Sequence, residues 1–225
     1  MSKFIIDTEK KQIIQPEDAE VKKDEIEKIT IDTEKGINKQ EKLEPLPVYS
    51  ENHKLLDEKI PEYKEGFPNP SMVKLAERLK ITMKMYAALG LSANQCGVPE
   101  RIFVIGTEYF QLVCINPEVI SMGDEKVKER EGCLSFPGLF LNLDRPKSIE
   151  VAFNDEHGNR KGMKIEGLTA RSFLHELDHL NGVKFTSYVK PLALKMARDR
   201  QDKIIRQAVR RQKKSESRIW TPGDR

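Results

Sequence analysis

The sequence HELDH at residues 175–179 supplies side chains that can bind a metal ion and use it for hydrolysis. His175 and His179 are four residues apart, so both imidazoles project from one face of a helix and can bind a single ion. Glu176 would lie about 100° around that helix from His175, where its carboxylate can reach a water at the ion. The pattern indicates a catalytic metal site; the alternative is a charged helix whose histidines only bond nearby backbone.

A cysteine upstream offers a third ligand. Cys133 lies in the sequence EGCLS at 131–135, a segment rich in turn and strand residues. The only glutamate or histidine after His179 is Glu216, which lies in a polar tail, so we expect the third ligand to come from upstream. Two imidazoles and one sulfur leave a fourth tetrahedral position open, as a hydrolytic site requires and a closed structural site lacks.

The helix that carries HELDH is apolar on its other sides, which predicts that its histidine face is enclosed by protein. We expect this helix to begin after Thr169 as N-cap and to end at Asn181-Gly182. Its apolar residues are Ala170, Phe173, Leu174, Leu177 and Leu180.

The stretch ALGLSANQCG at 88–97 is a third motif. With EGCLS and HELDH, in this order, it resembles the motifs of peptide deformylases, whose glycine-rich motif ends in glutamine. The resemblance covers about residues 46–190, and its variant motif suggests a divergent member of the family, such as a virus-encoded form. The residues that match are Gly90, Leu91, Ala93 and Gln95, whereas Ala88 and Ser92 replace a glycine and an alanine.

The resemblance implies hydrolysis of the N-formyl group from the N-terminal formylmethionine of newly made polypeptides, with release of formate. A metal-bound water attacks the formyl carbon, and Glu176 takes its proton and passes it to the departing amine. The oxyanion donors are then the Gln95 side-chain amide and the Leu134 backbone N–H. A structural hydrogen bond from Gln95 to the neighbouring loop is the alternative.

The expected metal ligands are Cys133, His175 and His179, which together hold one divalent ion per chain. Such ligands are compatible with Zn²⁺, whereas the resemblance favours Fe²⁺ as the native ion, with Ni²⁺ or Co²⁺ able to substitute. The resemblance also pairs Asp178 with an arginine, here Arg145, which would steady the site. A plain surface salt bridge between these two residues is the alternative.

The resemblance also locates the substrate. Gly90 and Gly132 flank the expected cleft, where the missing Cβ atoms would let a peptide backbone approach in extended form. Leu89 and Leu168 are candidates for the apolar pocket of the methionine side chain. Arg171 stands where relatives carry an apolar residue. Recognition of methionine is kept if its stem lines the pocket rim while its guanidinium reaches water; the alternative is a different side-chain preference at this pocket.

Composition favours a reducing compartment and excludes a membrane-spanning protein. The 3 cysteines are an odd number, and no apolar leader precedes them. No segment approaches the ~20 apolar residues of a membrane helix, and the acidic N-terminal region argues against a transit peptide. We therefore expect a cytoplasmic protein, of a bacterium or of an infected bacterial host, that acts on N-formylmethionyl nascent peptides and has no membrane or DNA partner.

The predicted fold class is α+β, with antiparallel or mixed strands packed around a central metal-binding helix that carries HELDH. We expect a charged extension over 1–45, a catalytic domain over 46–190, and a basic C-terminal helix and tail over 191–225. An N-terminal-side helix is predicted from Asn69-Pro70 or Ser71 to about Leu89 by its apolar periodicity. The predicted strands are 101–106, 112–116, 126–133, 148–154 and 160–166.

Both ends of the chain carry further patterns. The sequence IDTEK occurs at Ile6–Lys10 and again at Ile31–Lys35. We expect a mobile extension there, with a pair of short strands as the alternative. Basic and apolar residues interleave over 190–214, which predicts a basic amphipathic helix. By resemblance to deformylases with a helical C-terminal extension, this helix could contact the ribosome; packing on its own domain is the alternative.

Two other classes of protein remain as alternatives. One is another metallohydrolase, such as an aminopeptidase-like protease, which would act on unformylated peptides. The other is a ribosome- or RNA-binding module with a vestigial site. The presence of every expected catalytic and ligand side chain argues against a vestigial site; these are Gln95, Cys133, His175, Glu176 and His179.

Overall fold

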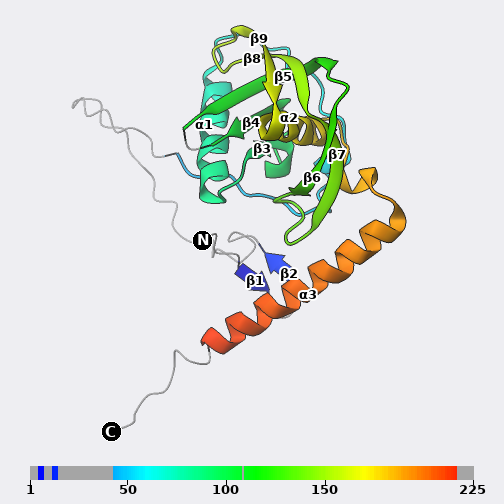
Figure 1. Cartoon of the computed structure of the whole chain (residues 1–225). Helices are drawn as coiled ribbons and strands as arrows, with labels where there is room; N and C mark the ends of the chain where they lie inside the picture. Colours follow the sequence, from blue (N-terminus) through cyan, green and yellow to red (C-terminus); the bar gives the residue numbers. More distant parts are fainter. Residues whose placement is uncertain (1–4, 8–11, 15–42, 108, 217–225) are drawn as a thin grey trace, which may run out of the picture.

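Figure 1 shows a computed structural model of the chain, which describes residues 5–7, 12–14, 43–107 and 109–216. Its strands form a five-stranded antiparallel sheet, in the order β3-β4-β5-β8-β9, and two separate hairpins, β1-β2 and β6-β7. The strands are β1 (Ile5–Asp7), β2 (Gln12–Ile14), β3 (Gly90–Ser92), β4 (Ile102–Gly106), β5 (Gln111–Met122), β6 (Lys126–Gly132), β7 (Phe140–Pro146), β8 (Ser148–Asn154) and β9 (Arg160–Glu166).

The described residues contain three α-helices and short 3-10 turns. The helices are α1 (Pro70–Met85), α2 (Gly167–Leu180) and α3 (Pro191–Glu216), and the turns are Lys54–Leu56, Ala93–Cys96 and Phe185–Tyr188. None of these helices is both long enough and apolar enough to cross a membrane. The mixed α+β architecture with antiparallel sheets is confirmed.

Strands β8 and β9 form the hairpin that the apolar alternation predicts. Ile149, Val151 and Phe153 are buried in β8, while Glu150 between them is exposed. In the loop that follows, Asp155 Oδ1 accepts hydrogen bonds from the backbone N–H groups two and four residues later, at 3.0 and 2.8 Å. The side chain thereby closes the turn, and β8 and β9 pair in register from end to end.

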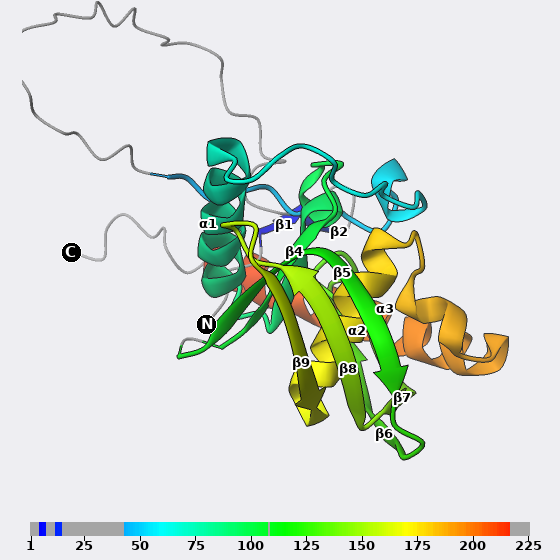
Figure 2. The ribbon, with the colours of Figure 1, turned by 90° about the horizontal axis from the view of Figure 1, so that it is seen from above.

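Helix α2 lies between the five-stranded sheet and the β6-β7 hairpin, as the two views in Figures 1 and 2 show. Phe173, which faces the sheet, meets Phe103 edge to face at 5.0 Å between ring centroids. Both rings are fully buried. Since this apolar side of α2 packs on the sheet, the HELDH histidines are directed to the side of β6 and β7.

Helix α1 begins as the sequence predicts, with Asn69 as its N-cap and Pro70 in its first turn. The Asn69 side-chain oxygen accepts hydrogen bonds from the N–H groups of Ser71 and Met72, at 2.9 and 3.3 Å. The buried face of α1 packs against β3 and β4. Its residues at helical spacing are Met72, Ala76, Leu79, Thr82 and Met83.

Helix α3 extends along the β6-β7 side of the molecule, drawn in orange in Figure 1. Its first turns pack Leu194 and Ala197 against Phe136 and Leu139. Strand β1 contacts α3, and β1 and β2 form the pair of short strands that was the alternative to a mobile extension. The second IDTEK copy lies outside the described residues.

Several predicted elements differ from the structure; among them, β5 runs to Met122 instead of ending at residue 116. Helix α1 ends at Met85 because Ala87 adopts a positive φ of 50°, which turns the chain toward β3. Helix α2 begins at Gly167, directly after β9, with Glu166 rather than Thr169 at the N-cap position. Strands β3 and β7 were not predicted. In β7 the buried positions Leu141, Leu143 and Arg145 alternate with exposed positions, and one of these buried residues is thus an arginine.

We expect Leu79→Ala to lower the free energy of unfolding by about 2–5 kcal/mol, because Leu79 is fully buried on the inner face of α1 and truncation leaves a cavity. The same substitution at Leu192, which is 70% exposed on α3, should change it by less than about 0.5 kcal/mol. Urea unfolding followed by circular dichroism measures both. Equal effects in the two variants would contradict the packing described for α1.

Candidate active site

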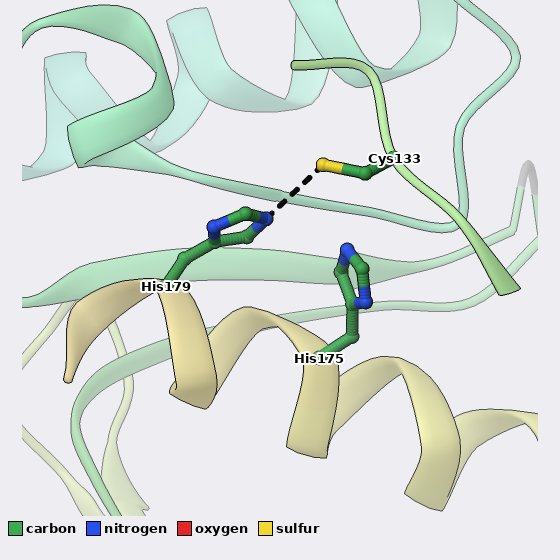
Figure 3. A group of neighbouring side chains, drawn as sticks. All are labelled: Cys133, His175 and His179. Atoms are coloured by element: carbon green, nitrogen blue, oxygen red, sulfur yellow. Dashed lines mark hydrogen bonds between the residues drawn. The ribbon is translucent and has the colours of Figure 1, made fainter. Parts of the chain in front are cut away.

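Three side chains of the kind that bind metals meet where β6 ends beside α2. Cys133 lies in the turn after β6, and His175 and His179 project from α2 toward it (Figure 3). One ligand atom from each lies within 4.8 Å of the others, and Cys133 Sγ is 3.2 Å from His179 Nε2. Among the residues that the structure describes, these three side chains form a group close enough to share one metal ion.

The surroundings of these side chains fit a bound cation. His175 Nε2 and Glu176 Oε2 are buried and have no hydrogen-bond partner among the described residues. Unpaired buried polar atoms are costly unless a ligand satisfies them. One thiolate and two imidazoles form a donor set typical of divalent transition metals. The residues therefore suit one such ion.

The Glu176 carboxylate lies against β3 at a position where Gly90 has no side chain. A Cβ on Gly90 would be 2.5 Å from Glu176 Oε1, closer than atoms can approach. Glu176 is only 4% exposed, and burial raises the pKa of its carboxyl group to about 7. The glycine expected to admit a substrate backbone thus also makes room for the enzyme's own carboxylate.

The Gln95 side chain is held in one orientation by the turn after β3. Its Oε1 accepts hydrogen bonds from the Ser92 N–H and the Ser92 hydroxyl, both at 3.0 Å. Its Nε2 lies 3.4 Å from Cys133 Sγ and 3.2 Å from Ser135 Oγ. The amide donor is therefore directed toward the cluster. Ser92, a departure from the family motif, adds one of the two bonds that set this orientation.

Asn94 is a residue of this turn that the sequence analysis did not single out. Its Nδ2 donates to the carbonyl oxygens of Leu55 and His179, at 3.0 and 2.7 Å. The side chain thus ties the end of α2 to the N-terminal side of the domain. Its place one residue before Gln95, inside the glycine-rich motif, was the only signal for this role.

Glu131 is the centre of a buried ion-pair network behind the histidines. It accepts two hydrogen bonds from Arg145, at 3.0 and 3.1 Å, and one from Arg171 at 2.7 Å. Its Oε2 lies 3.2 Å from His175 Nδ1, which leaves Nε2 of that ring directed toward the cluster. Burial alone would raise the pKa of the Glu131 carboxyl, but the bonds from His175 and Arg145 lower it to about 2.

The expected pair of Asp178 and Arg145 belongs to the same network. Arg145 Nη1 lies 2.7 Å from Asp178 Oδ2, and the Tyr188 hydroxyl donates to Asp178 Oδ1 at 2.9 Å. The side chains of Arg145 and Asp178 are 6% and 16% exposed, which does not fit a plain surface salt bridge. Arg145 therefore bridges Glu131 on β6 to Asp178 on α2.

Arg171 lines the cleft, but its guanidinium does not reach water. The side chain is 6% exposed and ion-pairs with Glu129 and Glu131. It also donates to the carbonyl oxygens of Val127 and Leu143, at 2.6 and 3.1 Å. The two acidic residues of β6 hold the guanidinium inside the protein, at the wall of the cleft.

A cleft of about 400 Å³ opens over the cluster, and the residues expected to bind the substrate line it. Leu89 and Leu168 line it and are 41% and 54% exposed. The space next to Gly132 is filled by the Phe140 ring, 2.6 Å from where a Cβ would lie. Lining residues named in the sequence analysis are Ala88, Leu89, Gly90, Gln95, Gly132, Cys133, Leu134, Leu168, Arg171, His175 and Glu176.

Comparison with known proteins agrees with this geometry. A family model described as Polypeptide deformylase matches residues 45–195, about two thirds of the chain. The chain belongs to the polypeptide deformylase family. The family is metal-dependent, and the cysteine and the two histidines of the cluster form a group that could hold an ion.

Individual deformylases cover different shares of the chain. The peptide deformylase of Prochlorococcus marinus (strain NATL2A) is 44% identical over 121 residues, 52% of this chain and 60% of that protein. The one of Aquifex aeolicus (strain VF5) is 37% identical over 160 residues, 62% of this chain and 94% of that protein. The crystal structure of a peptide deformylase from Legionella pneumophila matches with a TM-score of 0.67 at 30% identity, over 74% of this chain and 98% of that one.

We expect Arg145→Met to lower the free energy of unfolding by about 3 kcal/mol, because Glu131 and Asp178 keep buried negative charge without this partner. Lys128→Met on the same hairpin is the matched control, since its pair with Asp144 is exposed at 65% and 57%. Urea unfolding at equal metal loading compares the variants. A control as destabilised as Arg145→Met would show that the network is not the cause.

Proposed function

We propose that this chain removes the N-formyl group from the N-terminal formylmethionine of newly made polypeptides and releases formate. The observation that carries the proposal is one cleft in which a buried carboxylate, an oriented amide donor and a Cys-His-His cluster adjoin each other. Membership of the deformylase family supports it, as do the curated relatives that carry the name peptide deformylase.

Cys133, His175 and His179 would hold one divalent ion. The family resemblance favours Fe²⁺, and Zn²⁺, Ni²⁺ or Co²⁺ should substitute. When bound, such an ion acts as a Lewis acid that lowers the pKa of a water and polarises a carbonyl group. The contact between His175 Nδ1 and Glu131 supports this assignment, because it fixes the ring with Nε2 directed to the cluster.

Glu176 would act as general base and then as general acid. Its carboxylate is buried at the cleft next to Gly90, beside the three ligand residues. There it can take a proton from the attacking water and deliver it to the amine that departs. Enclosure by protein keeps bulk water from competing for the proton.

Gln95 Nε2 and the Leu134 N–H would stabilise the oxyanion that forms on the formyl oxygen. Both residues line the cleft, and the Ser92 bonds to Gln95 Oε1 set the amide in advance. A donor held in place costs no reorganisation during the reaction. Gln95 Nε2 also donates a hydrogen bond to Ser135 in the neighbouring loop. Because an amide NH₂ has two hydrogens, this structural bond leaves the second hydrogen for the oxyanion.

The methionine side chain of the substrate would lie on the apolar part of the cleft. Leu89 and Leu168 are exposed at its rim, and Tyr86, Phe136 and Leu139 are buried lining residues. Burial of an apolar side chain there would supply binding free energy of about 1.5–3 kcal/mol. Because the guanidinium of Arg171 is withdrawn into the ion-pair network, it leaves this apolar lining intact.

The outer face of α3 would contact ribosomal RNA. Its packing on the catalytic domain uses Leu194 and Ala197, whereas its basic side chains lie mostly on the other faces. Such a surface attracts polyanions, with an affinity that falls as salt rises. The basic residues from the start of the helix onward are Lys190, Lys195, Arg198, Arg200, Lys203, Arg206, Arg210, Arg211, Lys213 and Lys214.

Protein loaded anaerobically with Fe²⁺ or Ni²⁺ should release formate from formyl-Met-Ala-Ser and nothing from the acetylated peptide. Glu176→Gln should retain about one metal per chain yet lose roughly 10²–10⁴ in rate, because the amide cannot carry the proton. Formate is measured by coupled assay and metal by elemental analysis. Cleavage of unformylated Met-Ala-Ser would instead favour an aminopeptidase-like enzyme. No turnover despite bound metal would favour a vestigial site.

Gly90→Ala should lower kcat more than tenfold, because its Cβ would displace the Glu176 carboxylate, and small misplacements of catalytic groups are costly. Gly66→Ala is the control, since nothing lies within 4 Å of a Cβ at that position. Formate release by both variants is compared at equal metal content. Full activity of Gly90→Ala would argue against Glu176 as the proton carrier in this position.

A further inference from the structure

Arg130 is a charged residue of the cleft that the proposed reaction does not use. It lies on β6 three residues before Cys133, and it lines the cleft while its side chain is exposed. Its guanidinium carbon stacks over the Phe140 ring, 3.9 Å from the ring centroid. No acidic side chain among the described residues forms an ion pair with it.

The position of this guanidinium follows from the register of the β6-β7 hairpin. Gly132 is paired with Phe140, and Arg130 with Asn142, so Arg130 and Phe140 are diagonal neighbours on one face. Since Gly132 has no Cβ, the Phe140 ring lies flat against β6 in the space that a side chain would fill. The ring then provides the surface on which the guanidinium stacks beside the cleft.

The other charged residues that line the cleft are already satisfied or buried. Glu131 and Arg171 neutralise each other in the network, and Glu176 is enclosed beside Gly90. On its other side Arg130 adjoins a second groove, which contains three basic residues and one acidic residue, Asp144, itself paired with Lys128. The basic residues of that groove are Lys128, Lys190 and Arg200. Among the residues that the structure describes, the region around Arg130 is therefore positive, and no acidic side chain pairs with Arg130.

We propose that Arg130 makes the enzyme prefer substrates with an acidic side chain at the third residue of the formylated peptide. This inference rests on the proposed function. In an extended peptide the third side chain points to the same face as the first, about 7 Å further along. Arg130 lies three residues before Cys133, about 10 Å along extended chain, and its long side chain can cover the difference to meet that third residue while the methionine occupies the apolar pocket.

The test compares formyl-Met-Ala-Glu-Ser with formyl-Met-Ala-Lys-Ser on the Ni²⁺-loaded full chain at low salt, with formyl-Met-Ala-Ser-Ser as neutral reference. The parent protein should prefer the glutamate peptide by about threefold to tenfold in kcat/KM, because one ion pair is gained and one repulsion avoided. The difference should lie in KM, since Arg130 does not touch the reacting atoms. It should shrink in 0.5 M salt.

In each variant, the ratio of kcat/KM for the glutamate peptide to kcat/KM for the lysine peptide reports the effect of the charge at residue 130. A loss of folded protein lowers both values equally and leaves this ratio unchanged. Arg130→Gln should bring the ratio close to one, Arg130→Glu should invert it, and Arg130→Lys should keep much of it. Arg160→Gln removes the same charge from β9, outside the cleft lining, and should leave the ratio unchanged.

Two outcomes overturn the inference and can be told apart. A parent ratio near one, or a ratio that survives in Arg130→Gln, with formate still released from the neutral peptide, would overturn the inference alone. No formate from any of the three peptides would overturn the proposed function, and the inference with it.

Discussion

The buried carboxylate of Glu131 is the constraint on which the site depends. A carboxylate that is 5% exposed needs compensation for its lost hydration, and here two arginines and a histidine supply it. Arg145 carries the network on to Asp178, so the β6-β7 hairpin is bonded to α2 on both sides of His175. The contact that orients one ligand ring therefore also holds together the two elements that provide all three ligands.

Two glycines shape the walls of the cleft by leaving space for side chains from elsewhere. On β3, Gly90 accommodates the carboxylate of Glu176; on β6, Gly132 accommodates the ring of Phe140. A strand normally places a side chain at every second position of each face. Its absence at these two points lets groups from α2 and β7 approach the backbone. Side chains from neighbouring elements, Glu176 and Phe140, therefore fill the space beside the two glycines at the cleft. A Cβ atom added at either glycine would displace them and change the width of the cleft.

The sequence predicted the elements whose signal is local and missed those whose signal is not. Asn69-Pro70, the apolar spacing of α1 and the alternation in β8 each act within a few residues, and the structure contains them. Strand β7 was missed because one of its buried positions is Arg145, whose carboxylate partners lie 14 and 33 residues away. The burial of the Arg171 guanidinium could not be predicted for the same reason, since Glu129 and Glu131 are distant in sequence. A buried arginine can be recognised only when its partners are known.

The first turns of α3 make contacts that its basic sequence did not predict. Its sequence is basic throughout, which suggested one separate unit from residue 191. The packing is not uniform, because Gln201 is buried and donates to the Pro137 carbonyl at 2.8 Å, in the loop that lines the cleft. Arg198 adds an ion pair to Glu51 on the N-terminal side of the domain. The first three turns of α3 are therefore part of the catalytic domain and support its cleft.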